Sequence, residues 1–159
     1  KKPNSIGRSI GGVEMKIEDG ELLVRSPCVM EGYFQDEAAT REKIRDGWLH
    51  TGDMAHADED GYYYIDGRKD DMIIRAGLNI YPAEIENAAK DCSGVEDCVA
   101  FGRKTEEGNT EIVLRYEGQA IPALLRRELV QKLNPHAMPN KFEKVEKLER
   151  TPSGKKVRK

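Results

Sequence analysis

The sequence predicts an α+β protein, in which a small antiparallel β subdomain is followed by a compact α+β C-terminal domain with helices on a mixed three-stranded sheet. Short strand patterns dominate residues 10–67, and a single helical pattern interrupts them. After residue 68 the order becomes strand, helix, strand, strand, helix, strand. Between the two patterns lies Arg68–Asp71, four charged residues that can pack into neither core. We therefore expect one domain at residues 1–68 and a second at residues 69–159.

The first domain is expected to open with a β-hairpin. Residues 13–17 alternate apolar and polar side chains, Gly20 favours a turn, and residues 21–25 form a returning strand. Asp36 is a suitable N-cap for the helical pattern at residues 37–44. Further extended segments are expected at residues 48–50, 53–56 and 62–65, with a hairpin turn at Asp60–Gly61.

Prolines mark the helices expected in the second domain. Pro82 and Pro122 each stand where the first residue of a helix belongs, and Pro135 is expected to end the second helix. The apolar stripes of these helices consist of Ile85, Ala88 and Ala89 in the first and Leu125, Leu129 and Leu133 in the second. Strands are expected at residues 72–75, 95–102, 111–116 and 142–145.

The composition excludes several classes of protein. Charged residues make up 35% of the chain, and no apolar run approaches the roughly 18 residues of a membrane span, so we expect a soluble, cytoplasmic protein. A net charge of -3 argues against a general nucleic-acid binder. The three cysteines and three histidines lack the spacing of a disulfide set or a zinc site, so we expect free thiols and no metal site.

Four residues are candidates for a functional site. Asp53 follows a glycine at a strand end and could accept hydrogen bonds from two vicinal hydroxyls, although an ordinary turn aspartate has the same pattern. Arg68 could bind a sugar or a phosphate, or pair with a neighbouring aspartate such as Asp66 or Asp70.

The other two candidates lie in the second domain. Gly77 permits positive φ or close approach of a ligand, but hairpin glycines are common. Lys155 follows the turn formers of residues 151–154, so we expect it on a mobile loop from which its ammonium can reach an anion. A solvated basic tail is the alternative, because residues 151–159 carry four bases and no acid.

Taken together, these motifs resemble the last core motifs of the adenylate-forming superfamily, which includes acyl-CoA and aryl-CoA synthetases, peptide-synthetase adenylation domains and luciferases. The resemblance covers essentially the whole chain in the correct order. It rests on Gly52-Asp53, on Gly67 to Asp71 followed by Gly77 and Tyr81 to Glu86, and on Pro152 to Lys155 with Arg158.

The resemblance implies a ligase that uses MgATP to convert a carboxylic acid to acyl-AMP and then transfers the acyl group to the thiol of CoA. It implies that Asp53 holds the ribose hydroxyls, that Arg68 also contacts the nucleotide, and that Lys155 stabilises the reacting oxygens. Asp70 would be the hinge, and Gly77 would lie on a strand that lines the CoA passage.

The same resemblance implies that an upstream large domain, with the phosphate loop and the acid pocket, belongs to the enzyme. Residues 1–68 would be the last β subdomain of that large domain, and residues 69–159 the mobile C-terminal domain. This chain alone is then expected to be inactive. A carrier-protein-charging adenylation enzyme, a non-catalytic binding module and a nucleic-acid module remain alternatives.

Overall fold

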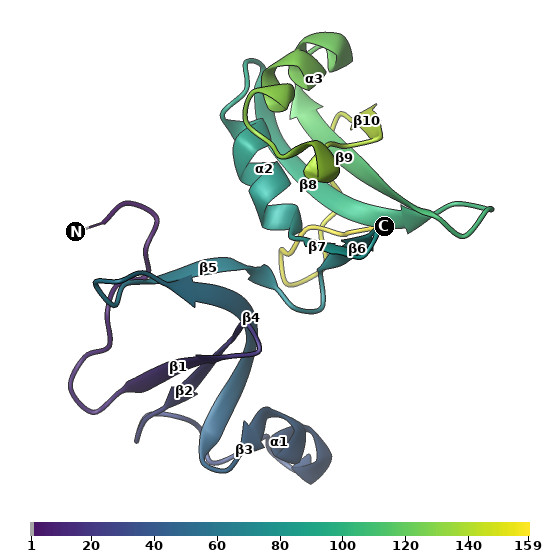
Figure 1. Cartoon of the computed structure of the whole chain (residues 1–159). Coiled ribbons are helices and arrows are strands. Elements are labelled where there is room, and N and C mark those ends of the chain that lie inside the picture. Colours follow the sequence, from purple (N-terminus) through teal and green to yellow (C-terminus); the bar gives the residue numbers. More distant parts are fainter. Residues whose placement is uncertain (1) are drawn as a thin grey trace. The chain divides into compact units, whose positions relative to one another are not determined.

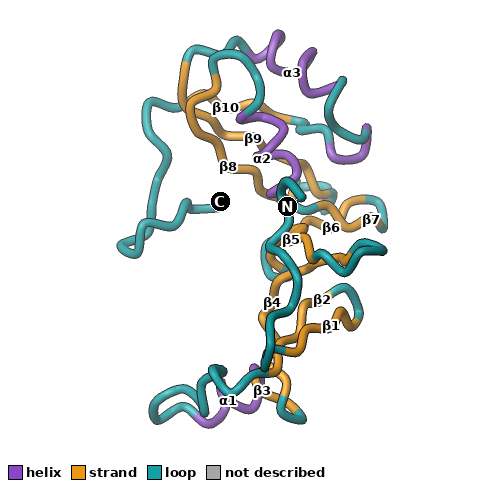
Figure 2. Tube along the Cα trace, turned by 90° about the vertical axis from the view of Figure 1, so that its left-hand side faces the viewer, coloured by secondary structure: helices purple, strands orange, loops and turns teal. Residues whose placement is uncertain are grey.

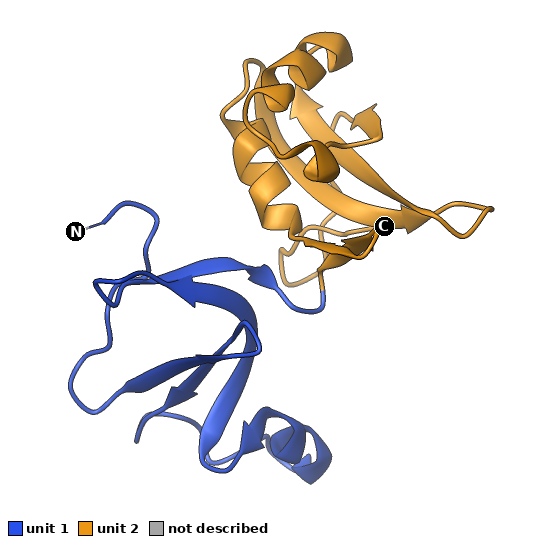
Figure 3. Cartoon of the chain, in the orientation of Figure 1, with its two compact units in different colours: residues 1–70 blue, residues 71–159 orange. Residues whose placement is uncertain are grey.

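The chain forms two compact units, residues 1–70 and residues 71–159, which Figure 3 colours separately. The computed structural model describes residues 2–159. Residues 69 and 70, which the sequence placed with the second domain, group with the first unit. One reason is a backbone hydrogen bond of 2.8 Å from Lys69 N to Gly52 O, which ties the chain after Arg68 to the first sheet.

The first unit is an antiparallel sheet with one short helix (Figure 1). The strand order is β1-β2-β4-β3, and β5 pairs with β4. The elements are β1 (Glu14–Glu18), β2 (Glu21–Arg25), α1 (Glu37–Lys43), β3 (Ile44–Arg45), β4 (Trp48–Ala57) and β5 (Tyr63–Arg68).

Local signals account for the start of this unit. The β1–β2 hairpin closes through Asp19 and Gly20, and the Asp36 carboxylate accepts a hydrogen bond of 2.9 Å from Ala39 N at the start of α1. Both predicted features are therefore confirmed. The two extended segments expected at residues 48–50 and 53–56 are one ten-residue strand, β4. Its pairing with β2 shifts register around Gly52, and its pairing with β5 shifts between Met54 and Ala55.

The second unit is an α+β domain built on a mixed three-stranded sheet, as the sequence predicted. Its strand order is β10-β9-β8, with β10 parallel to β9 and β8 antiparallel to it. The elements are β6 (Ile73–Arg75), β7 (Leu78–Ile80), α2 (Pro82–Lys90), β8 (Val95–Lys104), β9 (Thr110–Gly118), α3 (Pro122–Val130), the 3-10 helix η1 (Pro135–Ala137) and β10 (Lys141–Lys144).

The two faces of this sheet carry different layers. One face packs on α2 and α3, through the alternating residues Cys98 and Ala100 of β8 and Ile112 and Leu114 of β9. The intervening residues, Val99, Phe101 and Val113, pack with Leu148 of the chain that leads to the C terminus. Figure 2 shows the helices on one side of these strands and the terminal loop on the other.

Two expectations for the second unit are wrong in detail. Helix α3 ends at Val130, so Leu133 lies beyond it, and Pro135 begins η1 rather than ending α3. Leu133 is nevertheless buried with Leu125 and Leu129 in the same core. A strand that the sequence analysis did not expect, β7, pairs with β6 in an antiparallel hairpin.

Among residues 2–159, no helix has the length and apolar character that crossing a membrane requires.

Candidate functional site

Asp53 and Arg68 face each other on neighbouring strands of the first unit. They are register partners in the β4–β5 pair, and Arg68 Nη1 donates a hydrogen bond of 2.9 Å to Asp53 Oδ1. The same Nη1 donates to Thr51 O at 2.9 Å. The side chain of Asp53 is 31% exposed and that of Arg68 is 45% exposed, so both can still meet a ligand. Asp53 Oδ2 has no hydrogen bond within residues 2–70, which leaves one carboxylate oxygen available to an incoming hydroxyl.

The pairing of Arg68 differs from the alternatives that the sequence offered. Arg68 does not pair with Asp66, whose carboxylate binds His56 Nδ1 at 2.9 Å instead. Its contact with Asp70 is looser, at 4.0 Å between Nη2 and Oδ2. The antiparallel register across the hairpin, rather than closeness in sequence, decides which aspartate Arg68 meets.

The conformation and surroundings of Gly52 favour glycine at this position. Its φ is +73°, and a Cβ at this position would lie 2.9 Å from Arg68 Nη2. Both backbone groups of Gly52 are held: Gly52 N donates to Glu21 Oε1 at 2.9 Å, and Gly52 O accepts from Lys69 N at 2.8 Å. Because Gly52 has no Cβ, the guanidinium of Arg68 can pack directly against the backbone of β4, the strand that carries Asp53.

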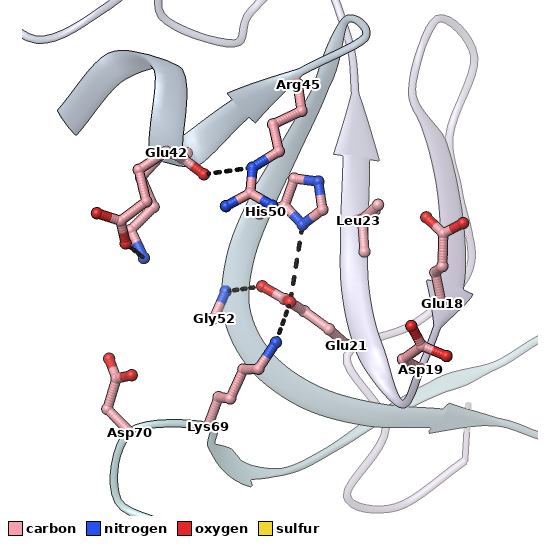
Figure 4. A pocket seen from close by; sticks show the side chains of 11 residues that line it. Glu18, Asp19, Glu21, Leu23, Glu42, Arg45, His50, Gly52, Lys69 and Asp70 are labelled. Carbon is pink, nitrogen blue, oxygen red and sulfur yellow. Dashed lines mark hydrogen bonds and ion pairs between the residues drawn. The ribbon is translucent and has the colours of Figure 1, made fainter. Parts of the chain in front are cut away.

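Glu21 lies beside Gly52 in a pocket of the first unit (Figure 4). The residue is 7% exposed, and its Oε2 forms an ion pair of 3.0 Å with Lys69 Nζ. Burial opposes the charge on Glu21, but the hydrogen bonds from Lys69 and Gly52 outweigh burial and hold its pKa below the ordinary value. The pocket has a volume of about 320 Å³ and includes Asp70 in its lining.

Asp70, the predicted hinge residue, is the last residue of the first unit. Its side chain is 79% exposed, and its only ion pair within residues 2–70 is the loose contact with Arg68. Lys69, by contrast, is held through both its backbone and its side chain. The firmly bound part of the first unit thus reaches as far as Lys69.

Lys155 lies in a tight turn of the second unit. We call residues 149–157 the terminal turn. Its two sides are joined by a bridge between Arg150 and Lys156, and Thr151 N donates to Lys155 O at 2.7 Å. The expected loop is therefore a closed, hydrogen-bonded turn. The side chain of Lys155 is exposed, and its ammonium makes no hydrogen bond or ion pair within residues 71–159.

One carboxylate holds both sides of the terminal turn. Asp97 Oδ2 pairs with Arg150 Nη2 at 2.7 Å, and Asp97 Oδ1 pairs with Lys156 Nζ at 2.5 Å. Burial opposes the charge on Asp97, but hydrogen bonds from Lys156 and Cys98 N outweigh it and hold its pKa below the ordinary value. Within residues 71–159, the ammonium of Lys155 is thus free while the backbone beneath it is fixed.

Arg158 fixes the chain just beyond the terminal turn. It pairs with the buried carboxylate of Glu86 on α2, donates to Ala100 O at 2.9 Å, and contacts Asp71 Oδ2 at 3.1 Å. Glu86 in turn accepts from Ala100 N at 2.9 Å. The ion pair with Arg158 therefore explains how Glu86, the last residue of the Tyr81 to Glu86 motif, can be buried.

Gly77 lies in the turn of the β6–β7 hairpin, not within a strand as the resemblance implied. Its φ is +79° and that of Ala76 is +50°, and a Cβ on Gly77 would meet nothing within 4 Å. The hairpin-glycine alternative therefore describes its backbone role. Two apolar side chains of this hairpin are exposed, Ile74 at 59% and Leu78 at 42%.

Sequence reasoning missed Glu21 and Asp97. A signal for Glu21 was present, because an acid at the first position of the apolar strand Glu21–Arg25 invites a buried partner. No local signal marks Asp97, whose partners lie more than fifty residues away in sequence. Within residues 2–159 there is no group of three or more His, Cys, Asp or Glu side chains that could hold a metal ion.

Residues 84–155 match the family model described as the AMP-binding enzyme C-terminal domain. A feruloyl-CoA synthase from Amycolatopsis sp is 41% identical over 146 residues, which cover 87% of this chain and 29% of that protein. A long-chain-fatty-acid–CoA ligase from Bacillus subtilis (strain 168) is 34% identical over 173 residues, which cover 99% of this chain and 31% of the ligase.

A solved structure is similar over nearly the whole chain. The o-succinylbenzoate CoA synthetase from Bacillus subtilis, in complex with its acyl-adenylate intermediate, matches with a TM-score of 0.92 and 30% identity, over 99% of this chain and 35% of that one. The same synthetase in complex with ATP and a magnesium ion matches with a TM-score of 0.91, at the same identity and coverage. This chain spans about a third of the length of these relatives. Its sequence motifs, its fold and these similarities show that the chain belongs to the adenylate-forming superfamily and is a C-terminal portion of such an enzyme.

Proposed function

We propose that this chain is the C-terminal part of an AMP-forming acid–thiol ligase, which activates a carboxylic acid as acyl-AMP and transfers it to CoA. The observation that carries the proposal is the division of ionic groups between the units. The first unit holds the cross-strand pair of Asp53 and Arg68, and the second holds Lys155, with a free ammonium, on the terminal turn. In this proposal the first unit, residues 1–70, belongs to the large adenylation domain, and the second unit, residues 71–159, forms the mobile C-terminal domain.

In the first step, a carboxylate oxygen of the acid attacks the α-phosphorus of ATP. The bond from that phosphorus to the bridging oxygen breaks, and pyrophosphate leaves. Asp53 accepts hydrogen bonds from the ribose hydroxyls, and Arg68 contacts the nucleotide. Negative charge spreads over the oxygens in the transition state, so the ammonium of Lys155 lowers the barrier most where that charge is greatest. Magnesium enters bound to the phosphates of ATP, as part of the substrate.

In the second step, the sulfur of CoA attacks the acyl carbon, and the bond to the phosphate oxygen of AMP breaks. The thiol loses its proton, and AMP leaves. Lys155 has no role in this step, so a rotation about Asp70 can remove it and bring the β6–β7 hairpin with Gly77 to the CoA passage. The exposed Ile74 and Leu78 of that hairpin support such a lining role, because they give it an apolar surface for the pantetheine arm.

An upstream large domain is the proposed partner of the first unit. Only three apolar side chains are buried among residues 2–70, namely Leu22, Leu23 and Ala55. Phe34 is 90% exposed and Ile10 is 74% exposed, which supports their being covered by another part of the enzyme. That domain would hold the acid pocket, so aryl, fatty and short-chain acids all remain candidate substrates.

Two further parts of the proposal concern the acceptor and the compartment. CoA is the proposed acceptor, and the phosphopantetheine thiol of a carrier protein is the alternative. A cytoplasmic location is proposed because Cys28, Cys92 and Cys98 are all free thiols, as expected in a reducing compartment.

Acid-dependent exchange of pyrophosphate into ATP, catalysed by the full-length enzyme that carries this chain, tests this function. Asp53→Asn should raise the KM for ATP about 10- to 100-fold, because hydrogen bonds to a charged group contribute about 1.5–3 kcal/mol. Asp66→Asn is the matched control, since Asp66 lies on β5 and pairs with His56 outside the proposed site. ATP binding without exchange for any acid tested would instead favour the non-catalytic module.

A further inference from the structure

Glu21 is one of only two buried charged side chains among residues 2–159, the other being Glu86. A carboxylate is expensive to bury unless hydrogen bonds and an opposite charge satisfy it. Glu86 forms an ion pair with Arg158, and this pair anchors the chain next to the terminal turn. The role of the buried Glu21 carboxylate can therefore be inferred from the groups that it contacts.

The two carboxylate oxygens of Glu21 have different partners. Oε1 accepts the hydrogen bond from Gly52 N at 2.9 Å, and Oε2 pairs with Lys69 Nζ at 3.0 Å. The Nδ1 of His50 lies 3.7 Å from Oε2, too far for a direct hydrogen bond. Figure 4 shows His50, Gly52 and Lys69 around the Glu21 carboxylate. His50 and Gly52 lie on β4, the strand that carries Asp53, and Lys69 directly follows Arg68, the last residue of β5.

The contact with Gly52 bears directly on Asp53. Gly52 takes a left-handed conformation in the stretch of β4 where its pairing with β2 shifts register, and its N–H is a donor that must be satisfied when buried. Glu21 supplies the acceptor from β2, the adjacent strand. The length of the Glu21 side chain therefore sets the position of the Gly52 backbone relative to β2. The direction in which the next residue, Asp53, presents its carboxylate depends on that position.

We propose that Glu21 is a positioning residue for the nucleotide-binding aspartate, acting through the backbone N–H of Gly52, with Lys69 as its counter-ion. The inference rests on the proposed function of Asp53. It assigns Glu21 no contact with substrate. An alternative is that Glu21 and Lys69 form an ion pair that contributes only to stability. The two roles differ in their effect on the affinity for ATP.

Three substitutions in the full-length enzyme separate geometry from charge. Glu21→Leu removes the acceptor and should raise the KM for ATP about tenfold while kcat changes less than about threefold. Glu21→Asp keeps the charge but shortens the side chain, so its KM should also rise. Glu21→Gln keeps an oxygen that can reach Gly52 N, so its KM should stay within about threefold of the parent. Lys43→Met, in the lining of the same pocket, is the control and should leave the KM unchanged.

Even if Glu21→Leu fails to fold, the comparison of Glu21→Asp with Glu21→Gln distinguishes a positioning role from an ion pair that contributes only to stability. A raised KM in Glu21→Asp with a parental KM in Glu21→Gln supports the proposal. Parental KM values in both, or equal losses in both, overturn it, because the acceptor position would then not control nucleotide binding.

A second measurement does not depend on ligase activity. Amide hydrogen exchange of Gly52, followed by NMR in the 159-residue chain, should be slow in the parent and in Glu21→Gln and faster in Glu21→Asp. Equal exchange in all three overturns the positioning role. If the parent enzyme showed no acid-dependent pyrophosphate exchange, that result would instead contradict the proposed function.

Discussion

At the scale of single residues, the first unit depends on small steric and electrostatic features around Asp53. Gly52 allows the guanidinium of Arg68 to lie over the strand, and the cross-strand register places that guanidinium on Asp53. Arg68 holds the carboxylate through one oxygen and leaves the other available. Arg68 thus fixes the orientation of the Asp53 carboxylate, and in the proposed function this lowers the entropy lost when a nucleotide binds.

Gly52→Ala tests this arrangement. The new Cβ would lie 2.9 Å from Arg68 Nη2 at a residue with φ of +73°, so we expect a loss of stability of about 1–3 kcal/mol in urea unfolding of the chain. The control is Gly61→Ala, in the same unit, where φ is +76° but a Cβ meets nothing within 4 Å. The control should lose only about 1 kcal/mol. Equal losses in the two variants would contradict the role assigned to the contact with Arg68.

The cysteines allow a second test at this scale. Cys28 is exposed, whereas Cys92 and Cys98 are buried. Burial raises the pKa of Cys98 to about 12, so its thiolate is scarce at neutral pH. Iodoacetamide at pH 7.5, followed by peptide mass spectrometry, should label Cys28 rapidly and the other two only after unfolding. Labelling of Cys98 at the rate of Cys28 in the folded protein would show that β8 is not packed as described.

At the scale of elements, the terminal turn is a structured carrier for Lys155. Its two sides converge on Asp97 of β8, and Arg158 ties the next segment to Glu86 on α2. The backbone near Lys155 is therefore fixed, and only the side chain of the lysine needs to be ordered when it meets an anion. In the proposed function of Lys155, such preorganisation favours electrostatic stabilisation of the transition state for adenylation.

Asp97→Asn should loosen the terminal turn without removing Lys155. The neutral amide cannot pair with both Arg150 and Lys156, so we expect adenylation to slow about 10-fold or more and the affinity for ATP to change little. Faster amide exchange of Lys155 and Val157 should accompany the loss. The matched control is Glu143→Gln, since Glu143 also bridges two cations, Arg103 and Arg115, on the same sheet. An adenylation rate equal to the parent in Asp97→Asn would contradict the anchoring role.

Local chemistry was enough to predict most elements. Asp36 caps α1, Pro82 and Pro122 open α2 and α3, and the alternation around Gly20 gives the first hairpin. The end of α3 was missed because the buried Leu133 continues the apolar stripe after the helical backbone has stopped at Val130.

The candidate site was only partly predictable. Asp53, Arg68 and Lys155 stand in recognisable motifs, and the cross-strand contact of the first two follows once the β4–β5 register is known. The partners of Glu21 and Asp97 lie 48 and 59 residues away in sequence, in Lys69 and Lys156. Only tertiary packing brings such groups together, and no local pattern reports it.

At the scale of the whole molecule, the proposed function divides the reacting groups between two units and assigns motion between these units to the reaction. Lys69 is bound to the first unit, while the side chain of Asp70 is exposed and, within residues 2–70, forms no ion pair other than the loose one with Arg68. Asp71 already pairs with Arg158 of the second unit. Asp70, the proposed hinge, therefore lies between two anchored positions.

Asp70→Pro in the full-length enzyme tests the hinge. Proline restricts φ to about −65°, so we expect the change between the two catalytic arrangements to be blocked. Of the two half-reactions, acyl-AMP formation and thioester formation from acyl-AMP, one should then proceed near the parental rate and the other should slow about 100-fold. Asp70→Ala, which leaves the backbone free to rotate, should retain both within about threefold. Equal slowing of both half-reactions by Asp70→Pro would argue against a hinge at this residue.

In the proposed function, the ammonium of Lys155 acts in adenylation and not in thioester formation. In the full-length enzyme, Lys155→Ala should slow formation of acyl-AMP about 100- to 1,000-fold, as expected for loss of a group that stabilises transition-state charge. Thioester formation from preformed acyl-AMP should stay within about threefold of the parent. Lys147→Ala, a neighbouring exposed lysine outside the terminal turn, should affect neither step. Equal rates of adenylation in Lys155→Ala and the parent, or equal losses in both half-reactions, would contradict the account.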